Sequence, residues 1–517
     1  MLSNKYPKED HAMNKKRLSA LALALLMAAV AFTSCNKNDA DESSAPSSNS
    51  DAVVSTSDNS GGEPEVSVGP LDHLVDRYTD KEVTFLVNTQ TDVSNGYRSI
   101  EICPNDEDQR YTYMNDAVDR RNRMIEEQLG IKISEIRTTT MTNDITNAIN
   151  TGSQEFQVVC PWMTDAGPLV ASGCFYDLRD YDDVIRFDQP YWDNNANESL
   201  SINNKLYFTT GDFSLLSMDV THCMIFNRDV VAENGLENPY DLVAEGKWTL
   251  DKMMELAAAV TSDSDGEPGY SYKDNIGLHV NSNYSNSFFI GSGENFIRKD
   301  SNDIPYLAIY NERATEVVSK ITSVFSSDAS LYIEGYNTQA QQDGFNNCYA
   351  AARDALANKR ALFVAISLSD IISLSNTYDC NFGLLVTPKF NEEQDSYHSY
   401  ISVICATCVA IPLSNEDPET AALAIEALNA ASTETTKKDY YERVLKAQKL
   451  KDEEGEQMLD FIFNNRVYDL GAIYNWGGIR DFLNSICVDG TDMFTSKYEA
   501  NKDSIEAAIN NTLDFAS

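Results

Sequence analysis

Short apolar runs alternate with helical segments between residues 83 and 172, and this alternation limits the fold more than any other feature of the sequence. Three runs predict strands, at 83–88 (VTFLVN), 131–136 (IKISEI) and 156–162 (FQVVCPW). Two segments predict helices, at 114–130 and 165–172, and the first of these ends at Gly130. Strands that alternate with helices predict a parallel sheet with crossover helices, so the expected fold class is α/β.

Helical signals continue along the rest of the chain. The segment 238–260 predicts two helices separated by a turn, with Thr249 as the N-cap of the second. A later helix is expected to begin cleanly, because Asp417 is a favourable N-cap and Pro418 fits the first helical position. Further helices are expected at 440–450, 457–464 and 505–515.

The N-terminus has the features of an export signal. Cations at 15–17 precede an apolar segment at 18–32 that is too short for an ordinary membrane span. Ser34 and Cys35 resemble the lipobox of bacterial lipoproteins, in which the signal is cut before the cysteine and the cysteine is acylated. The alternative is an ordinary signal peptide with an incidental cysteine.

These features divide the N-terminal part of the chain into two segments. Residues 1–34 are predicted to be a signal peptide, for which Met13 is a better start than Met1. Residues 35–78 contain the lipid-anchored Cys35 and a stretch rich in Ser, Asp, Asn and Gly. Because this stretch buries too little apolar surface to fold, we expect an acidic, disordered tether.

The chain is strongly acidic. Its 517 residues contain 40 Lys and Arg against 80 Asp and Glu, which gives a formal net charge of −40. A field of this sign repels phosphate backbones and anionic lipid surfaces, so nucleic acid is not expected as a partner. The same charge also favours solubility of the folded part.

The cysteines and histidines point to neither a disulfide framework nor a metal site. The cysteines after Cys35 are odd in number and lie scattered in apolar segments. Cys405 and Cys408 form a CxxC pair, but they lie in the apolar, strand-like run 401–412, where we expect them to pack in the core. The five histidines lack metal-ligand spacing, so neither a metal nor another cofactor is expected.

From about residue 80 to the end, the chain resembles the family-1 extracellular solute-binding proteins, the carbohydrate receptors of ABC importers that include maltose-binding protein. The order of several short stretches carries the resemblance: NNKLYFTTGD, KWTLDKMMELAAAV, ANKRALFVAIS, NFGLLVTPKF and NNRVYDLGAIYNWGG. It implies a periplasmic-binding-protein-like fold of type II, in which two α/β lobes clasp a ligand in the cleft between them. A hinged cleft suits a receptor, because closure around the solute signals that it is loaded.

The resemblance also implies where the chain divides. The lobes are expected at 79–218 with 386–433 (lobe 1) and at 219–385 with 434–517 (lobe 2). The chain would cross between them near 215–222, 383–390 and 430–437.

Sugar recognition needs aromatic faces that stack on C–H groups and carboxylates or amides that accept hydroxyl hydrogens. Residues of these types at strand ends and near the crossings are the candidate ligand contacts: Trp162, Asp165, Tyr191, Trp192, Asp193, Asp212, Tyr474, Asn475 and Trp476. For each of them the alternative is a packing role. Trp248, at a helix start, is expected to be structural. Where some relatives have Gly-Pro-Trp, this chain has Ala365, Ile366 and Ser367, which removes one stacking platform and argues against a maltose-like mode of binding.

The sequence therefore predicts a lipid-anchored extracellular receptor that captures a sugar or oligosaccharide and delivers it to ABC importer permease subunits. We expect a monomer at the outer face of the cell membrane, on a Gram-positive surface. The sequence has no GxSxG, HExxH or P-loop motif, so no enzyme activity is expected. Two alternatives stay open: a surface glycan-binding lipoprotein without an importer, and a secreted carbohydrate-active hydrolase.

Overall fold

The computed structural model describes residues 69–89, 99–105, 114–264, 266, 269–447, 453–490 and 493–516. All of these lie in one compact unit, Ser67–Ser517. The predicted signal peptide, Cys35 and most of the predicted tether lie outside the described residues. The end of the predicted tether differs from the expectation, because residues Asp72–Arg77 form a 3-10 helix, η2, in which Leu74 is buried.

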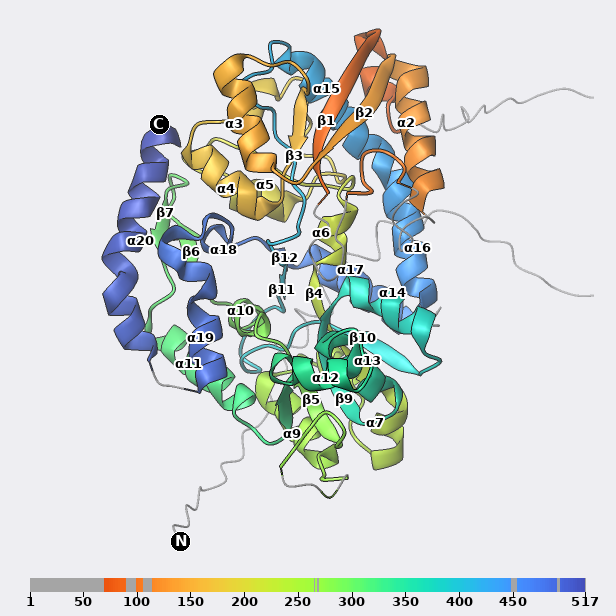
Figure 1. Cartoon of the computed structure of the whole chain (residues 1–517), viewed down its shortest axis with the longest axis vertical. Coiled ribbons are helices and arrows are strands. Elements are labelled where there is room, and N and C mark those ends of the chain that lie inside the picture. Colours follow the sequence, from red (N-terminus) through yellow and green to blue (C-terminus); the bar gives the residue numbers. More distant parts are fainter. Residues whose placement is uncertain are drawn as a thin grey trace, which may run out of the picture. The chain divides into compact units, whose positions relative to one another are not determined.

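Within the described ranges the strands are short and fall into four sheets. They are β1 (Lys81–Asn88), β2 (Ile131–Thr138), β3 (Val158–Cys160), β4 (His222–Asn227), β5 (Ile276–Val280), β6 (Ile297–Lys299), β7 (Pro305–Leu307), β8 (Ser330–Tyr332), β9 (Ala361–Ser367), β10 (Phe382–Leu385), β11 (Ser399–Tyr400) and β12 (Arg466–Val467). A three-stranded sheet has the order β2-β1-β3, and a five-stranded sheet has the order β10-β4-β9-β5-β8. In Figure 1 these two sheets occupy the upper and lower parts of the compact unit.

Helices make up most of the remaining structure. The α-helices are α2 (Asn115–Leu129), α3 (Met141–Thr151), α4 (Met163–Ala171), α5 (Asn194–Leu200), α6 (Leu215–Asp219), α7 (Arg228–Asn234), α8 (Pro239–Ala244), α9 (Leu250–Val260), α10 (Tyr284–Gly291), α11 (Glu312–Phe325), α12 (Asn337–Gln342), α13 (Cys348–Ala357), α14 (Leu368–Thr377), α15 (Pro418–Ser432), α16 (Lys438–Ala447), α17 (Glu453–Asn464), α18 (Leu470–Tyr474), α19 (Phe482–Asp489) and α20 (Phe494–Ala516). Short helical turns are η4 (Leu178–Tyr181), η5 (Ile333–Tyr336), η6 (Thr433–Lys437) and η7 (Trp476–Asp481).

The parallel sheet predicted from the first strands is confirmed. β1 pairs in parallel with β2, with Val83 opposite Ile133, and in parallel with β3, with Phe85 opposite Val158. The five-stranded sheet is mixed, since β4 runs antiparallel to both β9 and β10 while β5 runs parallel to β8 and β9. As a result, the carboxyl ends of β5, β8 and β9 meet at one edge.

The helix boundaries follow the local signals of the sequence. Helix α2 ends where Gly130 takes a left-handed conformation at φ +69°, which a residue with a Cβ adopts only at a cost. Thr249 caps α9 by accepting from the backbone N–H of Lys252, and Asp417 caps α15 by accepting from that of Thr420. These three predictions are confirmed.

Several residues that the sequence predicts to pack in the core are buried in the structure. Trp248 is fully buried and its Nε1 donates to the carbonyl oxygen of Val386 at 2.9 Å. Cys405 and Cys408 are buried, and neither forms a disulfide. The run 401–412 that contains them differs from the expected strand, because within it the chain makes isolated bridges, such as Ala410 with Val159, in place of a regular ladder. No helix in the described ranges has both the length and the apolar character that crossing a membrane requires.

Candidate functional site

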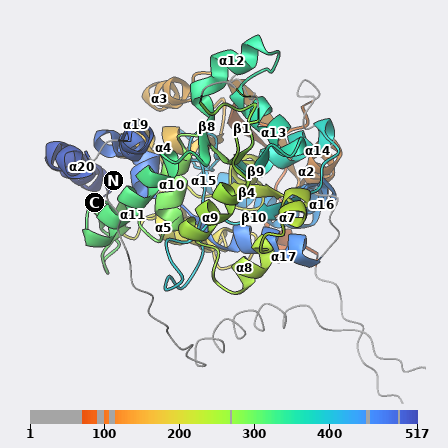
Figure 2. The same ribbon diagram turned by 90° about the horizontal axis from the view of Figure 1, so that it is seen from below.

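The structure separates most of the candidate ligand contacts into two groups. Trp192, Asp193 and Asp212 line a cavity that we call the polar pocket. Trp162 and Asp165 on one side, and Tyr474 and Trp476 on the other, lie where α4 meets α18, and we call these four residues the aromatic cluster. In Figure 1, α4 and α5 overlap, but the turned view of Figure 2 separates them.

The polar pocket has a volume of about 360 Å³. It is lined by Pro190, Trp192, Asp193, Asn194, Asn195, Asp212, Met218, Lys437, Phe463, Asn464 and Arg466. Carboxylates, amides and cations predominate in this lining. The volume is near the lower end of the range of roughly 300–1,000 Å³ for small-molecule sites.

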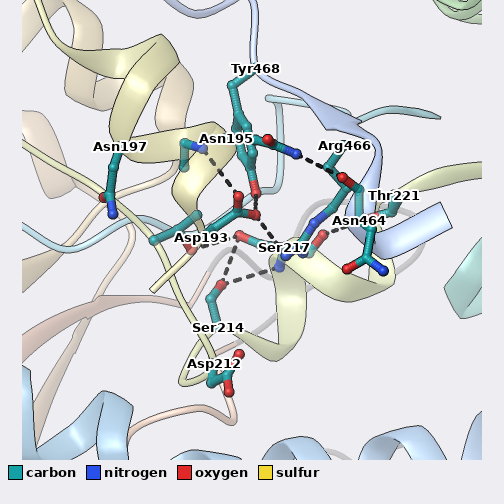
Figure 3. Close-up of polar contacts among 12 residues, drawn as sticks. Asp193, Asn195, Asn197, Asp212, Ser214, Ser217, Thr221, Asn464, Arg466 and Tyr468 are labelled. Atoms are coloured by element: carbon teal, nitrogen blue, oxygen red, sulfur yellow. Dashed lines mark hydrogen bonds and ion pairs between the residues drawn. The ribbon is translucent and has the colours of Figure 1, made fainter. Parts of the chain in front are cut away.

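Both carboxylate oxygens of Asp193 have partners around the pocket (Figure 3). Because it is the N-cap of α5, its Oδ1 accepts from the backbone N–H of Ala196 at 3.1 Å. Its Oδ2 accepts from the hydroxyl of Tyr468 and pairs with the guanidinium of Arg466, both at 2.6 Å. Both oxygens are thus satisfied within the protein.

Asp212 makes the second ion pair of the pocket. Its Oδ1 lies 2.7 Å from Nζ of Lys437, and its Oδ2 accepts from the Thr433 hydroxyl at 2.8 Å. Both partners belong to η6, a π-helical turn between α15 and α16. Burial raises the pKa of Asp212, and the opposite charge of Lys437 limits that rise.

Tyr191 and Trp192 are bonded within the protein to one buried carboxylate. The hydroxyl of Tyr191 donates to Oε1 of Glu426, and the indole Nε1 of Trp192 donates to Oε2 at 2.9 Å. Glu426, on α15, also contacts the ring of His73 at 3.0 Å and accepts from the backbone N–H of Arg186. This pair of aromatics therefore anchors the loop before α5 to α15.

The aromatic cluster contains two buried polar atoms without partners in the described part of the chain. Trp162 and Tyr474 are only 5% and 7% exposed. Among the described residues, neither the Nε1 of Trp162 nor the hydroxyl of Tyr474 has a hydrogen-bond partner. We call these two atoms the open pair. Burying such a group without a partner costs about 1–3 kcal/mol, so native structures rarely retain one without a reason.

Asp165 supplies a carboxylate in the same neighbourhood. Burial raises its pKa, while the amide of Asn88, which donates to it at 3.5 Å, acts in the opposite direction. Its charge is close enough to influence the thiol of Cys408, which in turn influences the hydroxyl of Tyr474. Asp165 thus lies near the open pair, at the first turn of α4.

Backbone contact between α4 and α18 depends on Gly167. A Cβ at this position would lie 3.0 Å from the Cα of Tyr474 and 3.2 Å from the carbonyl oxygen of Ile473. Any larger residue would push the two helices apart. Helices α4 and α18 are therefore in close contact at Gly167.

The polar groups of Asn475 and Trp476 have hydrogen-bond partners within the protein. Asn475 takes a left-handed conformation at φ 50°, and its Oδ1 accepts from the backbone N–H of Arg480. Trp476 stacks on Tyr474, and its Nε1 donates to the hydroxyl of Thr512 on α20 at 3.0 Å.

The sequence analysis did not find the cations of the pocket, Lys437 and Arg466. Arg466 directly follows Asn465 in the stretch NNRVYD, and nothing in that stretch indicates which side chain it meets in the fold. Arg466 reaches the pocket because β12 lies beside α5 in the fold. No group of three or more His, Cys, Asp or Glu side chains in the described part of the chain is placed to hold a metal ion.

By sequence, no protein-family model and no characterised protein matches the chain. Comparison of structures finds clear similarity to sugar-binding proteins. A sugar transporter from Rhizobium etli in an open conformation is 13% identical over 83% of this chain and 99% of its own, with a TM-score of 0.53. The cyclic alpha-maltosyl-1,6-maltose binding protein from Arthrobacter globiformis is 11% identical over 84% and 100%, with a TM-score of 0.53.

A cyclo/maltodextrin-binding protein complexed with maltotetraose is also similar. It is 11% identical over 84% of this chain and 96% of its own, with a TM-score of 0.52. At such identities the similarity concerns the fold. The expected two-lobed, periplasmic-binding-protein-like α/β fold is confirmed.

Proposed function

We propose that this protein is an extracytoplasmic sugar receptor, which captures a sugar or oligosaccharide for an ABC importer and carries out no chemistry on it. The observation that carries the proposal is the aromatic cluster. There, the stacked rings of Tyr474 and Trp476, the half-buried carboxylate of Asp165 and the open pair lie on or next to α4 and α18, two helices that pack against each other. The shared fold with proteins named for binding maltodextrin and maltosyl-maltose supports a carbohydrate as the solute.

The chemistry of the cluster suits a sugar. The ring faces of Trp162 and Tyr474 offer apolar surfaces for C–H groups, and Asp165 offers oxygens that accept from hydroxyls. The open pair offers a donor at Trp162 and a donor or acceptor at Tyr474. Sugar hydroxyls between the two walls would satisfy these groups, and part of the binding free energy would come from that satisfaction.

The division into lobes is part of this proposal. Lobe 1 (79–218 and 386–433) would contain the three-stranded sheet, and lobe 2 (219–385 and 434–517) the five-stranded sheet. Trp162 and Asp165 would then face Tyr474 and Trp476 across the cleft. Separation of the lobes would expose the cluster, and closure on a sugar would bury it again.

The location of the receptor rests on the N-terminal sequence. We propose that Cys35 is acylated and that the acidic tether holds the monomeric receptor beside permease subunits on a Gram-positive cell surface. Replacement Cys35→Ser is expected to release the protein into the soluble fraction. Retention of this variant on membranes would contradict acylation.

Calorimetric titration tests the solute. The protein beginning at Asn36 is titrated with a panel of mono- and oligosaccharides, with amino acids and peptides as controls. Micromolar or tighter binding of one sugar class, without turnover, is the expected result. Binding of amino acids or peptides alone would reject a carbohydrate, and consumption of a sugar would favour the hydrolase alternative.

A further inference from the structure

We propose that the hairpin 297–307, formed by β6 and β7, is a strap between the lobes, which holds the cleft closed around a bound sugar and slows its release. The strap contacts a turn of the other lobe at residues 201–205. The inference rests on the proposed function and on the proposed lobe division. Five residues make the contact and are called the clasp: Lys299 and Asp303 on the strap, and Ser201, Asn203 and Asn204 on the turn.

The turn belongs to the side of the three-stranded sheet. Ile202 and Lys205 exchange two backbone hydrogen bonds, of 2.9 and 3.0 Å, which close the turn. The next residue, Leu206, accepts from the backbone N–H of Leu178 at 2.8 Å and donates its own N–H to Oδ1 of Asp177 at 2.9 Å. The helical turn η4, which begins at Leu178, contacts α15, and α15 contacts β1. The turn therefore moves with lobe 1.

The strap belongs to the side of the five-stranded sheet. The ring of Phe296, directly before the strap, stacks on that of Phe289 in α10, with centroids 5.5 Å apart. The guanidinium of Arg298 donates to the carbonyl oxygen of Gly293, just after α10, at 3.1 Å. Helix α10 contacts α11, and α11 contacts β8 of the five-stranded sheet. All of these elements lie within residues 219–385, so the strap moves with lobe 2.

The base of the strap is also connected to the helix that carries Tyr474. The carboxylate of Asp469 is buried, and its Oδ2 accepts from the backbone N–H of Phe296 at 2.8 Å. Its Oδ1 accepts from the backbone N–H of Gly471 in α18 at 2.7 Å. One carboxylate therefore joins the strap to the helix on which the hydroxyl of the open pair lies.

Asp303 accepts three hydrogen bonds from the turn. Its Oδ1 accepts from the hydroxyl of Ser201 at 3.0 Å, and its Oδ2 accepts from the backbone N–H of Asn204 at 2.9 Å. Its carbonyl oxygen accepts from the backbone N–H of Asn203, also at 2.9 Å. Successive N–H groups in a turn form a concave donor surface that suits an anion. The turn thus receives the carboxylate of the other lobe.

Lys299 adds a cation to the same contact. Its Nζ donates to the carbonyl oxygen of Ser201 at 3.0 Å, to the hydroxyl of Ser201 at 2.9 Å and to the carbonyl oxygen of Glu198 in α5. It also pairs with the carboxylate of Asp303 on the strap itself. The side chains of Lys299 and Asp303 are only 19% and 16% exposed, so salt screens their contacts less than it screens exposed ones. Both charges of the strap therefore bind polar groups of the other lobe.

The backbone of the clasp has an uncommon conformation on both sides. Asn203, Asn204 and Asp303 have φ values of 54°, 63° and 65°, and they are three of the five non-glycine residues with positive φ in the described part of the chain. Asn and Asp visit this region more readily than other residues that carry a Cβ, and two in succession suit a two-residue turn. Such conformations persist where the surrounding contacts hold them, often at sites with a function. Their concentration in the clasp supports a specific contact.

The strap lies on the side of the molecule where the lobes would separate. In Figure 1, β6, β7, α18 and α20 lie together at the left, whereas α6, β10 and α16, which adjoin the proposed crossings, lie toward the centre and right. Figure 2 also places α20 far from α16, and β7 contacts α20. Rotation about the crossings would therefore separate the clasp as well as the aromatic cluster. A sugar between α4 and α18 leaves only after the clasp has opened.

The test uses variants on both sides of the clasp. The strap variant combines Lys299→Met with Asp303→Gly, which removes both charges together and leaves neither uncompensated, while glycine keeps the left-handed backbone. Ser201→Ala removes one hydroxyl from the turn and is the milder variant. The matched control combines Lys359→Gly with Glu233→Gln. It also removes a left-handed residue and its ion pair, but both of its residues lie within lobe 2.

Distances between the lobes are measured without sugar. Spin labels carried by unnatural amino acids replace the exposed residues Asn147 on α3 and Glu316 on α11. The strap variant is expected to lose population from the shortest distances, Ser201→Ala is expected to lose less, and the control is expected to match the native protein. Native distributions in both clasp variants, or an equal loss in the control, would overturn the proposal.

The rate of sugar release is the second readout. With the sugar found by calorimetry, stopped-flow displacement is expected to show release roughly tenfold faster in the strap variant and about threefold faster in Ser201→Ala. Native release rates together with altered distances would contradict the role of the strap in release. If no sugar binds the native protein, the proposed function fails, whereas the distance measurement still decides whether the strap holds the lobes together.

Discussion

The ring of Trp476 stacks on that of Tyr474, with centroids 4.5 Å apart and planes inclined by 17°. The polar atoms of these two side chains differ in their hydrogen bonding. The Nε1 of Trp476 donates to Thr512, whereas the hydroxyl of Tyr474 belongs to the open pair. The stack therefore has one polar atom with a partner in the fold and one without a partner among the described residues.

This difference predicts opposite effects of Tyr474→Phe on stability and binding. Removing a buried hydroxyl without a partner should leave the free energy of unfolding unchanged or raise it by about 1 kcal/mol. Sugar affinity should fall roughly tenfold, because the hydroxyl would no longer bond to the ligand. Denaturation and calorimetry measure the two quantities. A loss of stability together with native affinity would assign Tyr474 to packing alone.

Gly167→Ala should separate α4 from α18. Because the added Cβ meets backbone atoms of Ile473 and Tyr474, the helices cannot relax by a side-chain rotation alone, and a loss of about 1–3 kcal/mol is expected. Gly335→Ala is the control, since its Cβ would make only ordinary contact with the ring of Tyr332. Equal stability of the two variants in urea would show that the contact between α4 and α18 is adaptable.

Glu101 should make stability depend on pH. Burial raises its pKa to about 7, although Leu216 N–H and the Ser214 hydroxyl, which donate to it, act in the opposite direction. In the unfolded state Glu101 has the ordinary pKa of 4.5, so the unfolded state loses this proton at a lower pH than the folded state does. Stability should therefore fall as the pH rises from 4.5 to 7, by at most about 3 kcal/mol.

Glu101→Gln isolates this effect, because the amide oxygen can still accept from Ser214 and Leu216. The difference in stability between the native protein and the variant, measured by urea denaturation from pH 4 to 8, should follow the predicted fall. Subtraction removes the contribution of Asp469, whose pKa burial raises to about 6. A difference that is constant with pH would show that Glu101 does not titrate in this range.

Glu426→Leu should strongly destabilise the folded protein. The substitution leaves His73, Tyr191, Trp192 and the backbone N–H of Arg186 without their shared acceptor. A loss of more than about 3 kcal/mol in the free energy of unfolding is expected. Glu419→Leu, at an exposed position of the same helix, should change it by less than about 0.5 kcal/mol. Similar losses in both variants would mean that the acceptor is dispensable.

The sequence by itself determined the features that depend on near neighbours. Alternating periodicity predicted the parallel strands β1, β2 and β3, and the caps at Thr249 and Asp417 marked helix starts, because such signals act within a few residues. The apolar run 401–412 shows the limit of this reasoning. Its burial was predictable, but its pairing depends on Val159, Trp162 and Thr209 elsewhere in the chain.

Only the tertiary structure decided how the candidate residues combine. Asp212 and Lys437 are 225 residues apart, and no local pattern indicates that they meet. Likewise, the aromatic residues near Tyr191 were recognisable as a cluster, but the buried carboxylate that bonds to them comes from α15. Side-chain partners across such separations are set by how the sheets and helices pack, because chain folding brings together residues that share no local signal.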